Sequence, residues 1–537
     1  MRPWLALVIS LAFAFAYAAT RNIYDDEVAS FGTTMRPFAE IWRAANAGDI
    51  HPPGQYVLSS FFLNLMGSAR SMTLGPLVFI YIGLTSFVAA LLRNNTLVGS
   101  SRTLFAVVAF LHPQILMWGG SIRWQSYWTG LALIVLTLGL SLHREPEDEK
   151  LDLPSYPVLL TTGLLLAALL YINYLSFVLI GAFALAWAIR YPMSPASWAR
   201  LAFTLAIAGL LFIPQIRPLV DVHMASAARQ TPSGIGVFLK LLPGALVGQA
   251  LMPWHPVAPL FGLTTLPFFF VLLGRARRHF FGHSGAARAI RLPSPTWLAL
   301  LFMYLVVFAM ALGTGLGGKP RSFVILSPIF AYLLAVAWQW TSSRALRRTA
   351  IVVVGLWIAS SGYNLLAKVG TTKGGVNDRY DEVLAVAQEE LSGRKTLFFT
   401  HDTSLAFALH DAAETLGEAW AVCGTADDYY HGSPCLPAIQ DDRKVERVVL
   451  VTSFIGSFLT HQLSLNRAQQ AVSDSIHIDR RAQVSWDRDA AMKRRIPGRK
   501  TQLCPDYRFT LYFGRPNPAV DFEALAEGYR NLTPDPP

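Results

Sequence analysis

The apolar residues of this chain are gathered into long runs that are separated by short polar connectors. The first run, residues 3–19, contains no charged side chain, and further runs of comparable length follow as far as residue 366. A helix of about 20 apolar residues is long enough to cross the hydrocarbon core of a bilayer. Only 15% of the 537 residues are charged, compared with about 25% in soluble proteins. The sequence therefore predicts a polytopic α-helical membrane protein.

Eleven of the apolar runs are predicted to span the membrane. They are residues 3–19, 71–92, 103–118, 124–142, 156–171, 174–189, 201–216, 256–273, 296–312, 323–340 and 349–366. The first run could instead be a cleaved signal peptide, because Ala16-Tyr17-Ala18 has small residues at a cleavage-like spacing. We favour an uncleaved helix, since many spans follow. In both cases the residues after it emerge on the outer face.

The segment after His51-Pro52-Pro53 decides the orientation of the later spans. It is apolar as far as Ala69 but short for a span, so it is either a juxtamembrane helix or a short transmembrane helix. If it stays on the outer surface, the Arg-rich connectors 274–295 and 341–348 lie inside, as the positive-inside rule requires. We therefore predict a juxtamembrane helix here. A second one is predicted over residues 35–47, where apolar and charged residues follow helical spacing.

The formal net charge of +11 could suggest a nucleic-acid partner. Many of the basic residues, however, lie in short connectors between apolar runs, where they orient the spans. We therefore expect membrane lipids and no nucleic acid around this chain. The basic connectors thus set the orientation of a chain that passes the membrane several times.

Residues 1–366 are thus predicted to form a transmembrane domain with a first outer loop at 21–70, and residues 367–537 a C-terminal extracytoplasmic α/β domain. An amphipathic helix is expected at 381–391 and short buried strands at 396–400 and 445–452, an arrangement compatible with a parallel sheet. In an oxidising compartment Cys423 and Cys435 could pair and leave Cys504 over. Three free thiols are the alternative.

Three acids, Asp25, Asp26 and Glu27, directly follow the first span. Charges beside a membrane are costly when buried, and they are useful when they face a cavity at its surface. These acids could serve as a general base, bind a divalent cation or cap a helix. No other metal site and no further cofactor is predicted.

Cations are expected at the same outer level as the acids. Arg123 lies where one span emerges, and Lys319 and Arg321 lie where another does. Arg can hold a phosphate group in a bidentate way, and Lys can hold it as a point charge. The alternative for all three is interfacial anchoring, which is frequent for basic residues near span ends. Tyr174 in a short outer turn could likewise face substrate or belong to an aromatic belt.

The order of these motifs resembles that of the GT-C superfamily of membrane glycosyltransferases, and in particular protein O-mannosyltransferases and lipid A aminoarabinose transferases. That pattern has an Asp-Glu pair after the first span, then a His-Pro-Pro or Lys-Pro-Pro before an apolar helix. Here these are Asp26-Glu27 and His51-Pro52-Pro53-Gly54-Gln55-Tyr56. A later outer Arg resembles Arg123, and Arg321 resembles a basic residue before a Pro-containing span. The similarity covers roughly residues 1 to 340.

The resemblance implies inverting transfer of a hexose or pentose from a polyprenyl-phosphate donor to an acceptor hydroxyl on the outer face. It implies Asp26 as base, with Glu27 as supporting acid and Asp25 as the rival one residue away. Arg123, Lys319 and Arg321 would bind the donor phosphate. His51, Tyr56 and Tyr174 would contact substrate. The acceptor could be a glycan, a lipid or a protein. The resemblance also implies a multi-pass protein of a bacterial inner (plasma) membrane.

Two other functions are compatible with a polytopic chain of this kind. A transporter or flippase for a lipid-linked sugar would carry charges within its spans and broken helices related by a repeat, and neither is visible. An enzyme like the O-antigen polymerases or ligases would share the donor chemistry. The long outer loop 217–254 is the feature that keeps this second alternative open.

Overall fold

The computed structural model describes the greater part of the chain. The described residues are 3–21, 27, 30, 33–47, 51–66, 73–93, 97–142, 153–191, 194–224, 246–247, 265, 267, 271, 323–366, 380–400, 403–424, 445–454, 469–486, 507–519 and 525. The chain divides into two compact units. One contains Met1–Thr20 and Arg36–Ala367, and the other contains Arg21–Met35 and Lys368–Pro537.

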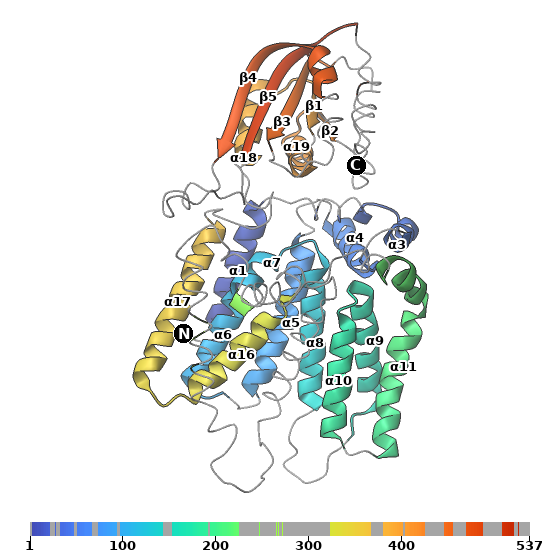
Figure 1. Cartoon of the computed structure of the whole chain (residues 1–537), viewed down its shortest axis with the longest axis vertical. Coiled ribbons are helices and arrows are strands. Elements are labelled where there is room, and N and C mark those ends of the chain that lie inside the picture. The colour runs from blue at the N-terminus through green and yellow to red at the C-terminus, as the bar shows by residue number, and fades with distance from the viewer. Residues whose placement is uncertain are drawn as a thin grey trace. The chain divides into compact units, whose positions relative to one another are not determined.

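The described part of the first unit is helical (Figure 1). Its longer helices are α1 (Pro3–Thr20), α5 (Leu74–Arg93), α8 (Trp124–Leu142), α9 (Tyr156–Ile172), α10 (Ser176–Arg190), α11 (Pro195–Pro218), α16 (Leu326–Gln339) and α17 (Arg344–Leu366). The shorter ones are α3 (Phe38–Ala47), α4 (Gly54–Met66), α6 (Ser100–Leu111), α7 (Pro113–Trp118) and the π-helical turn η2 (Leu219–Met224).

Among the described residues, three helical stretches are long and apolar enough to cross a membrane: Leu74–Arg93, Pro195–Asp221 and Arg344–Tyr363. Shorter apolar helices occupy Pro3–Ala19, Tyr156–Ile172, Ser176–Leu185 and Leu326–Gln339. The predicted spans 296–312 and, except for three residues, 256–273 lie outside the described residues, so the predicted number of eleven stays a prediction.

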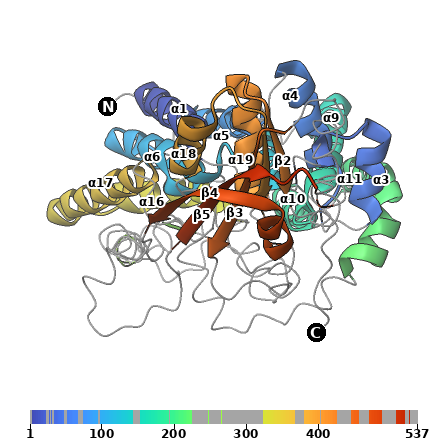
Figure 2. The same cartoon turned by 90° about the horizontal axis from the view of Figure 1, so that it is seen from above.

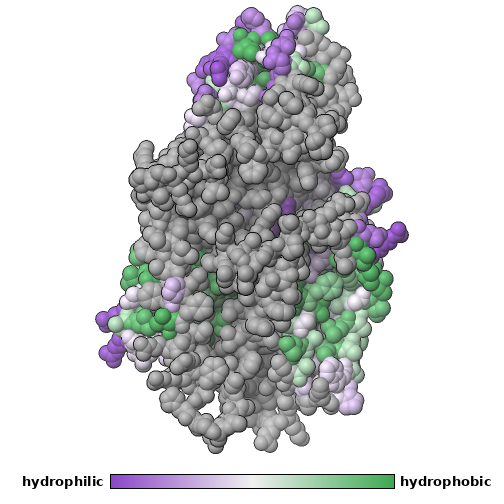
Figure 3. All heavy atoms as spheres, viewed as in Figure 1, coloured by the Kyte–Doolittle hydropathy of each residue, from purple (hydrophilic) through white to green (hydrophobic). Residues whose placement is uncertain are grey.

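The helices of the first unit differ in which side chains they bury. All residues of α16 from Leu326 to Trp338 are buried, so this helix lies in the interior. In contrast, Leu210 of α11 is 67% exposed and Val352 of α17 is 58% exposed. Apolar side chains on the outer surface of the described helices are visible in Figure 3. Large exposed apolar surfaces are rare on soluble monomers and are expected where lipid covers the protein.

Small residues bring α5 and α8 into close contact. A Cβ atom added to Gly83 would collide with the backbone of Gly130, and one added to Gly130 would collide with the backbone of Phe79. In an apolar solvent helices associate largely through close packing, and glycine allows two backbones to approach. This packing fixes the position of the N-terminal end of α8, where Arg123 lies.

The predicted span 103–118 is wrong as one continuous helix. It is broken into α6 and α7 at His112, whose backbone is extended (φ −60°, ψ 130°). Pro113 causes the break, because its ring disfavours helical geometry in the residue before it. The His112 side chain then caps α7 by accepting a hydrogen bond from the Gln114 amide at 3.2 Å.

Helices α3 and α4 lie together at one end of the bundle, beside α9 and α11 (Figures 1 and 2). The two helices predicted over these residues are present, and their place at the membrane surface stays a prediction. The start of α4 is held tightly, because a Cβ on Gly54 would lie 2.5 Å from the Tyr171 carbonyl oxygen. The Trp42 ring of α3 lies 5.5 Å from the Tyr171 ring. The end of α9 therefore anchors both short helices.

The second unit contains a five-stranded sheet in the order β2-β1-β3-β5-β4. The strands are β1 (Thr396–Thr400), β2 (Trp420–Gly424), β3 (Arg447–Phe454), β4 (Ile476–Trp486) and β5 (Tyr507–Pro516). Strands β2, β1 and β3 are parallel, whereas β5 runs antiparallel to both β3 and β4. The predicted strands 396–400 and 445–452 are confirmed as β1 and β3, and a parallel sheet describes only three of the five strands.

Both faces of the central strands are buried. Phe398 of β1 packs in one cluster with helices α18 (Tyr380–Leu391) and α19 (Thr403–Leu416). Its neighbours Leu397 and Phe399 point to the opposite face and pack in a second cluster. Because alternate residues of a strand point to opposite faces, a strand covered on both sides must be apolar throughout. This explains why β1 reads as a continuous apolar run.

An ion pair joins β3 to β4, which are not neighbours in the sheet. Arg447 Nη1 and Nη2 donate to Asp479 Oδ2 and Oδ1 at 2.6 and 2.8 Å. Arg515 of β5 lies 3.6 Å from the same carboxylate. The hydrogen bonds from Arg447 hold the pKa of the Asp479 carboxyl below its usual range. A lowered pKa stabilises the folded state above the unfolded-state pKa of about 3.9, and this contribution is lost as the pH falls through the folded-state pKa.

We expect the α/β unit to lose stability in acid through Asp479. In the full-length protein, the midpoint of thermal unfolding should fall between about pH 5 and pH 2, and the Asp479→Asn variant should show a shallower fall because it lacks the titrating group. Asp474→Asn is the matched control, because Asp474 accepts a hydrogen bond from Gln470 rather than from an arginine. Equal acid sensitivity of all three proteins in scanning calorimetry would contradict this assignment.

Candidate functional site

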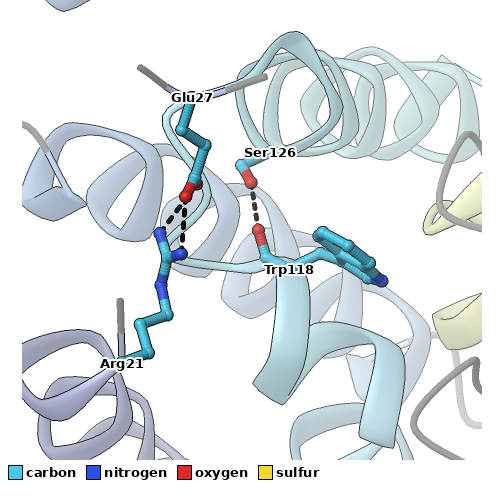
Figure 4. A network of polar contacts seen from close by, with 4 residues as sticks. All are labelled: Arg21, Glu27, Trp118 and Ser126. Carbon is cyan, nitrogen blue, oxygen red and sulfur yellow. Dashed lines mark hydrogen bonds and ion pairs between the residues drawn. The ribbon is translucent and has the colours of Figure 1, made fainter. Parts of the chain in front are cut away.

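The first loop contains a buried ion pair between Arg21 and Glu27. Arg21 Nη1 and Nη2 donate to Glu27 Oε2 and Oε1 at 2.7 and 2.8 Å (Figure 4). The two side chains are 2% and 0% exposed. Two parallel hydrogen bonds between a guanidinium and a carboxylate are a strong, charge-assisted contact. The Glu27 carboxylate is therefore held by Arg21, six residues earlier, a partner that the sequence pattern did not reveal.

Four of the predicted site residues lie outside the described residues. These are Asp25, Asp26, Lys319 and Arg321. Within the described ranges no group of three or more His, Cys, Asp or Glu side chains is placed to hold a metal ion. The proposed cation site at the first-loop acids includes Asp25 and Asp26 and so remains a prediction.

The structure brings two predicted site residues into contact in the first unit. Arg123 Nη2 lies 3.0 Å from His51 Nε2, although 72 positions separate them in the sequence. A guanidinium carries only N–H groups, so Nε2 of the imidazole must accept, and the neutral ring then carries its proton on Nδ1. Arg123 is only 9% exposed. An arginine held in this way is suited to bind an anionic oxygen group.

Helix ends place both residues. His51 lies just before α4, which begins at Gly54, and Pro52-Pro53 leads into that helix. Proline lacks a backbone N–H, and this is tolerated where a helix begins because the first N–H groups have no partner within the helix. Arg123 lies in the short connection between α7 and α8. This connection is closed by Ser126 Oγ, which donates a hydrogen bond to the Trp118 carbonyl (Figure 4). The Trp124 ring, 6.0 Å from the His51 ring, packs beside the pair.

One face of α4 contacts the first turn of α8 and a residue of α5. Gln55, Ser59 and Phe62 are spaced by four and three residues, which places them on one helix face. Ser59 Oγ donates to the Tyr127 hydroxyl of α8 at 3.1 Å, and Phe62 packs edge-on to Phe79 of α5. This face therefore points into the bundle, toward α8 and α5.

The two predicted substrate-binding tyrosines occupy different surroundings. Tyr56 is 2% exposed and packs with Ile41 and Ala45 of α3. Tyr174 is 8% exposed, and its ring lies 6.1 Å from that of Phe212 in α11. In these positions both side chains hold helices together, and their contact with substrate stays a prediction.

The site also contains a residue that the sequence did not single out. Gln55 is 1% exposed, and within the described part of the chain neither atom of its side-chain amide has a hydrogen-bond partner. A buried glutamine has no local sequence signature, because its burial depends on how α4 packs against other helices. Only the sequence His51-Pro52-Pro53-Gly54-Gln55-Tyr56, read as one motif, drew attention to this stretch.

Comparison with known proteins gives matches at the level of structure. No protein-family model and no curated protein sequence matches the chain. The crystal structure of ArnT from Cupriavidus metallidurans in the apo state is similar, with a TM-score of 0.53 and 12% identity. The match covers 94% of this chain and 97% of ArnT. ArnT bound to undecaprenyl phosphate matches with a TM-score of 0.52, the same identity and the same coverage.

At 12% identity such a likeness establishes the fold. It extends over nearly the whole of both chains, so the helical unit and the α/β unit are both included. The fold agrees with the resemblance that the motifs Asp26-Glu27 and His51-Pro52-Pro53 indicated. The chain has the fold of ArnT.

Proposed function

We propose that the chain is a glycosyltransferase that transfers a hexose or pentose from a polyprenyl-phosphate donor to an acceptor hydroxyl on the outer face of the membrane. The observation that carries this proposal is the contact between His51 and Arg123 at the ends of α4 and α8, on a fold shared with ArnT. One ArnT structure contains undecaprenyl phosphate, which is a lipid phosphate of the proposed donor class.

In the proposed reaction Arg123 binds the phosphate of the donor. As the bond between the anomeric carbon and the phosphate oxygen breaks, its electron pair goes to that oxygen, and a fixed cation stabilises the charge that develops there. Lys319 and Arg321 are proposed to act in the same way. His51 holds Arg123 in position, because its Nε2 accepts a hydrogen bond from the guanidinium.

Asp26 is proposed as the base. It takes the proton of the acceptor hydroxyl while the oxygen of that hydroxyl attacks the anomeric carbon from the side opposite the phosphate, which inverts the configuration. Asp25 is the alternative base. A divalent cation at these acids is a further part of the proposal, and the effect of EDTA on sugar transfer tests it.

The α/β unit is proposed to lie on the extracytoplasmic side of a bacterial inner membrane. Cys423 in β2 is disulfide-bonded. Disulfides persist mainly in oxidising compartments, such as the bacterial periplasm, and are rare in the cytosol. The disulfide therefore supports an extracytoplasmic position for the α/β unit. The acceptor, which would be a glycan, a lipid or a protein, is proposed to be on this same side of the membrane.

Sugar transfer should depend on the carboxylate of Asp26. Asp26→Asn should lower the rate of sugar transfer by roughly 10²–10⁴-fold, because an amide cannot accept the hydroxyl proton. Transfer is measured with a labelled undecaprenyl-phosphate sugar in membranes that contain the full-length protein. Asp25→Asn is the matched variant, and a larger loss there would move the base by one residue. Undiminished transfer by both variants would contradict the proposed base.

Binding of the donor phosphate should depend on Arg123. Arg123→Ala should weaken binding of undecaprenyl phosphate by roughly 10-fold to 10²-fold, because a charge-assisted contact with the phosphate is lost. Arg200→Ala is the control. Arg200 donates to the Pro154 carbonyl at 2.7 Å and packs on Tyr156, at the end of α9 opposite Tyr171. A similar loss of affinity in both variants would indicate general damage to the fold.

A role of Glu27 in stability can be measured separately from a role in sugar transfer. Glu27→Gln should destabilise the protein by about 3–5 kcal/mol, because it removes the carboxylate that accepts two hydrogen bonds from the buried Arg21 guanidinium. The double variant Arg21→Met with Glu27→Gln should regain much of this stability, since it removes the buried positive charge as well. Thermal unfolding and sugar transfer are measured together. If transfer returns with stability, Glu27 is structural, and if stability returns without transfer, Glu27 acts in the reaction.

A further inference from the structure

Gln55 stands out among the buried polar side chains near the proposed site. The residue is 1% exposed, and neither Oε1 nor Nε2 has a hydrogen-bond partner among the residues that the structure describes. Most buried polar side-chain atoms in proteins are paired, and a buried amide without a partner is costly to the folded state. Near a binding site, a ligand can supply the missing partner of such a group.

The position of Gln55 follows from its place on α4. Gln55 lies in the first turn of this helix, four residues after His51, which contacts Arg123. Ser59, one turn further along α4, contacts Tyr127 of α8. Residues four apart lie one above the other along a helix, so Gln55 shares the face of α4 that contacts α8. It is also close in the chain to His51, which contacts the arginine that is proposed to bind the donor phosphate.

We propose that the side-chain amide of Gln55 binds a hydroxyl group of the donor sugar. This proposal rests on the proposed function, in which the sugar is attached to the phosphate at Arg123. A hydroxyl both donates and accepts, and a glutamine amide offers an acceptor oxygen and two N–H donors, so the two groups match. A site built to hydrogen-bond a hydroxyl discriminates strongly against ligands that lack it, because its own buried groups then stay unpaired. Gln55 thus determines specificity for the sugar rather than for the lipid phosphate.

The experiment compares Gln55→Met with the wild-type protein. Methionine has nearly the shape of glutamine but cannot form these hydrogen bonds. Binding of two probes to the purified full-length protein is measured: undecaprenyl phosphate alone, and undecaprenyl phosphate carrying a hexose or a pentose, whichever the wild-type protein binds more tightly. We expect Gln55→Met to weaken binding of the sugar-bearing probe about tenfold, and to leave binding of undecaprenyl phosphate within about twofold.

Gln215→Met is the matched control. Gln215 in α11 is also fully buried, and neither of its amide atoms has a hydrogen-bond partner in the described ranges. Replacing a buried unpaired amide with an apolar side chain should leave the thermal midpoint of the ligand-free protein unchanged or raise it in both variants. Only Gln55→Met should lose affinity for the sugar-bearing probe. A loss of the same size in Gln215→Met would show that removing any buried amide has this effect.

The remaining outcomes separate this inference from the proposed function. If Gln55→Met loses affinity for both probes equally, Gln55 supports the phosphate site and the sugar contact is wrong. If Gln55→Met binds both probes as the wild-type protein does, the sugar contact is also wrong, although the proposed function stands. If the wild-type protein binds neither probe, the proposed function itself fails, and this inference fails with it.

Discussion

A hydrocarbon layer offers no hydrogen-bond partners to a polypeptide, and this constraint organises the first unit. Every backbone N–H and C=O inside the layer must be paired within the chain, which restricts spanning segments to helices with mostly apolar side chains. Polar chemistry is then displaced to the ends of the helices and to the turns between them. His51 and Arg123 occupy such positions, at the start of α4 and in the connection before α8. The proposed donor site therefore lies at helix ends, because polar groups are costly further inside the hydrocarbon layer.

The precision of this site depends on the packing of the surrounding helices. Gly83 and Gly130 let the backbones of α5 and α8 approach, and Gly54 lets α4 lie against the end of α9. At each of these contacts the glycine has no Cβ atom, so the two backbones can approach without a collision. Because α4 and α8 are both held by their neighbours, the side chains at their ends have fixed positions. Gln55 is buried there with no hydrogen-bond partner among the described residues, and in our proposal the donor sugar completes its pairing.

Charged side chains in the second unit are stabilised by pairing. Arg21 with Glu27 and Arg447 with Asp479 each form two parallel hydrogen bonds. The pairs differ in burial, because the side chains of the first are almost completely buried and Asp479 is 30% exposed. Removing one partner should therefore matter most at Glu27, where the remaining charge cannot reach water. This is the physical reason for separating its structural role from any role in the reaction.

The sequence by itself determined the positions of most helices, because an apolar run or a proline affects the conformation of the residues next to it in the chain. The runs that became α1, α5, α8, α9 and α10 were predicted to within a few residues, as were the two short helices α3 and α4. The strands β1 and β3 were also predicted, since a strand buried on both faces is apolar throughout. The break at His112 was missed, although Pro113 marks it in the sequence. The motif order further predicted the fold shared with ArnT.

Only the tertiary structure decided which side chains meet. His51 finds Arg123 across 72 positions, and Ser59 finds Tyr127 across 68, because α4 docks against α8. No periodicity in the sequence encodes those pairings, since they depend on the orientation of whole helices. The same holds for Gln55, whose residue type suggests an exposed position and whose burial follows from the packing of α4. Local patterns determine elements, and the packing of elements determines sites.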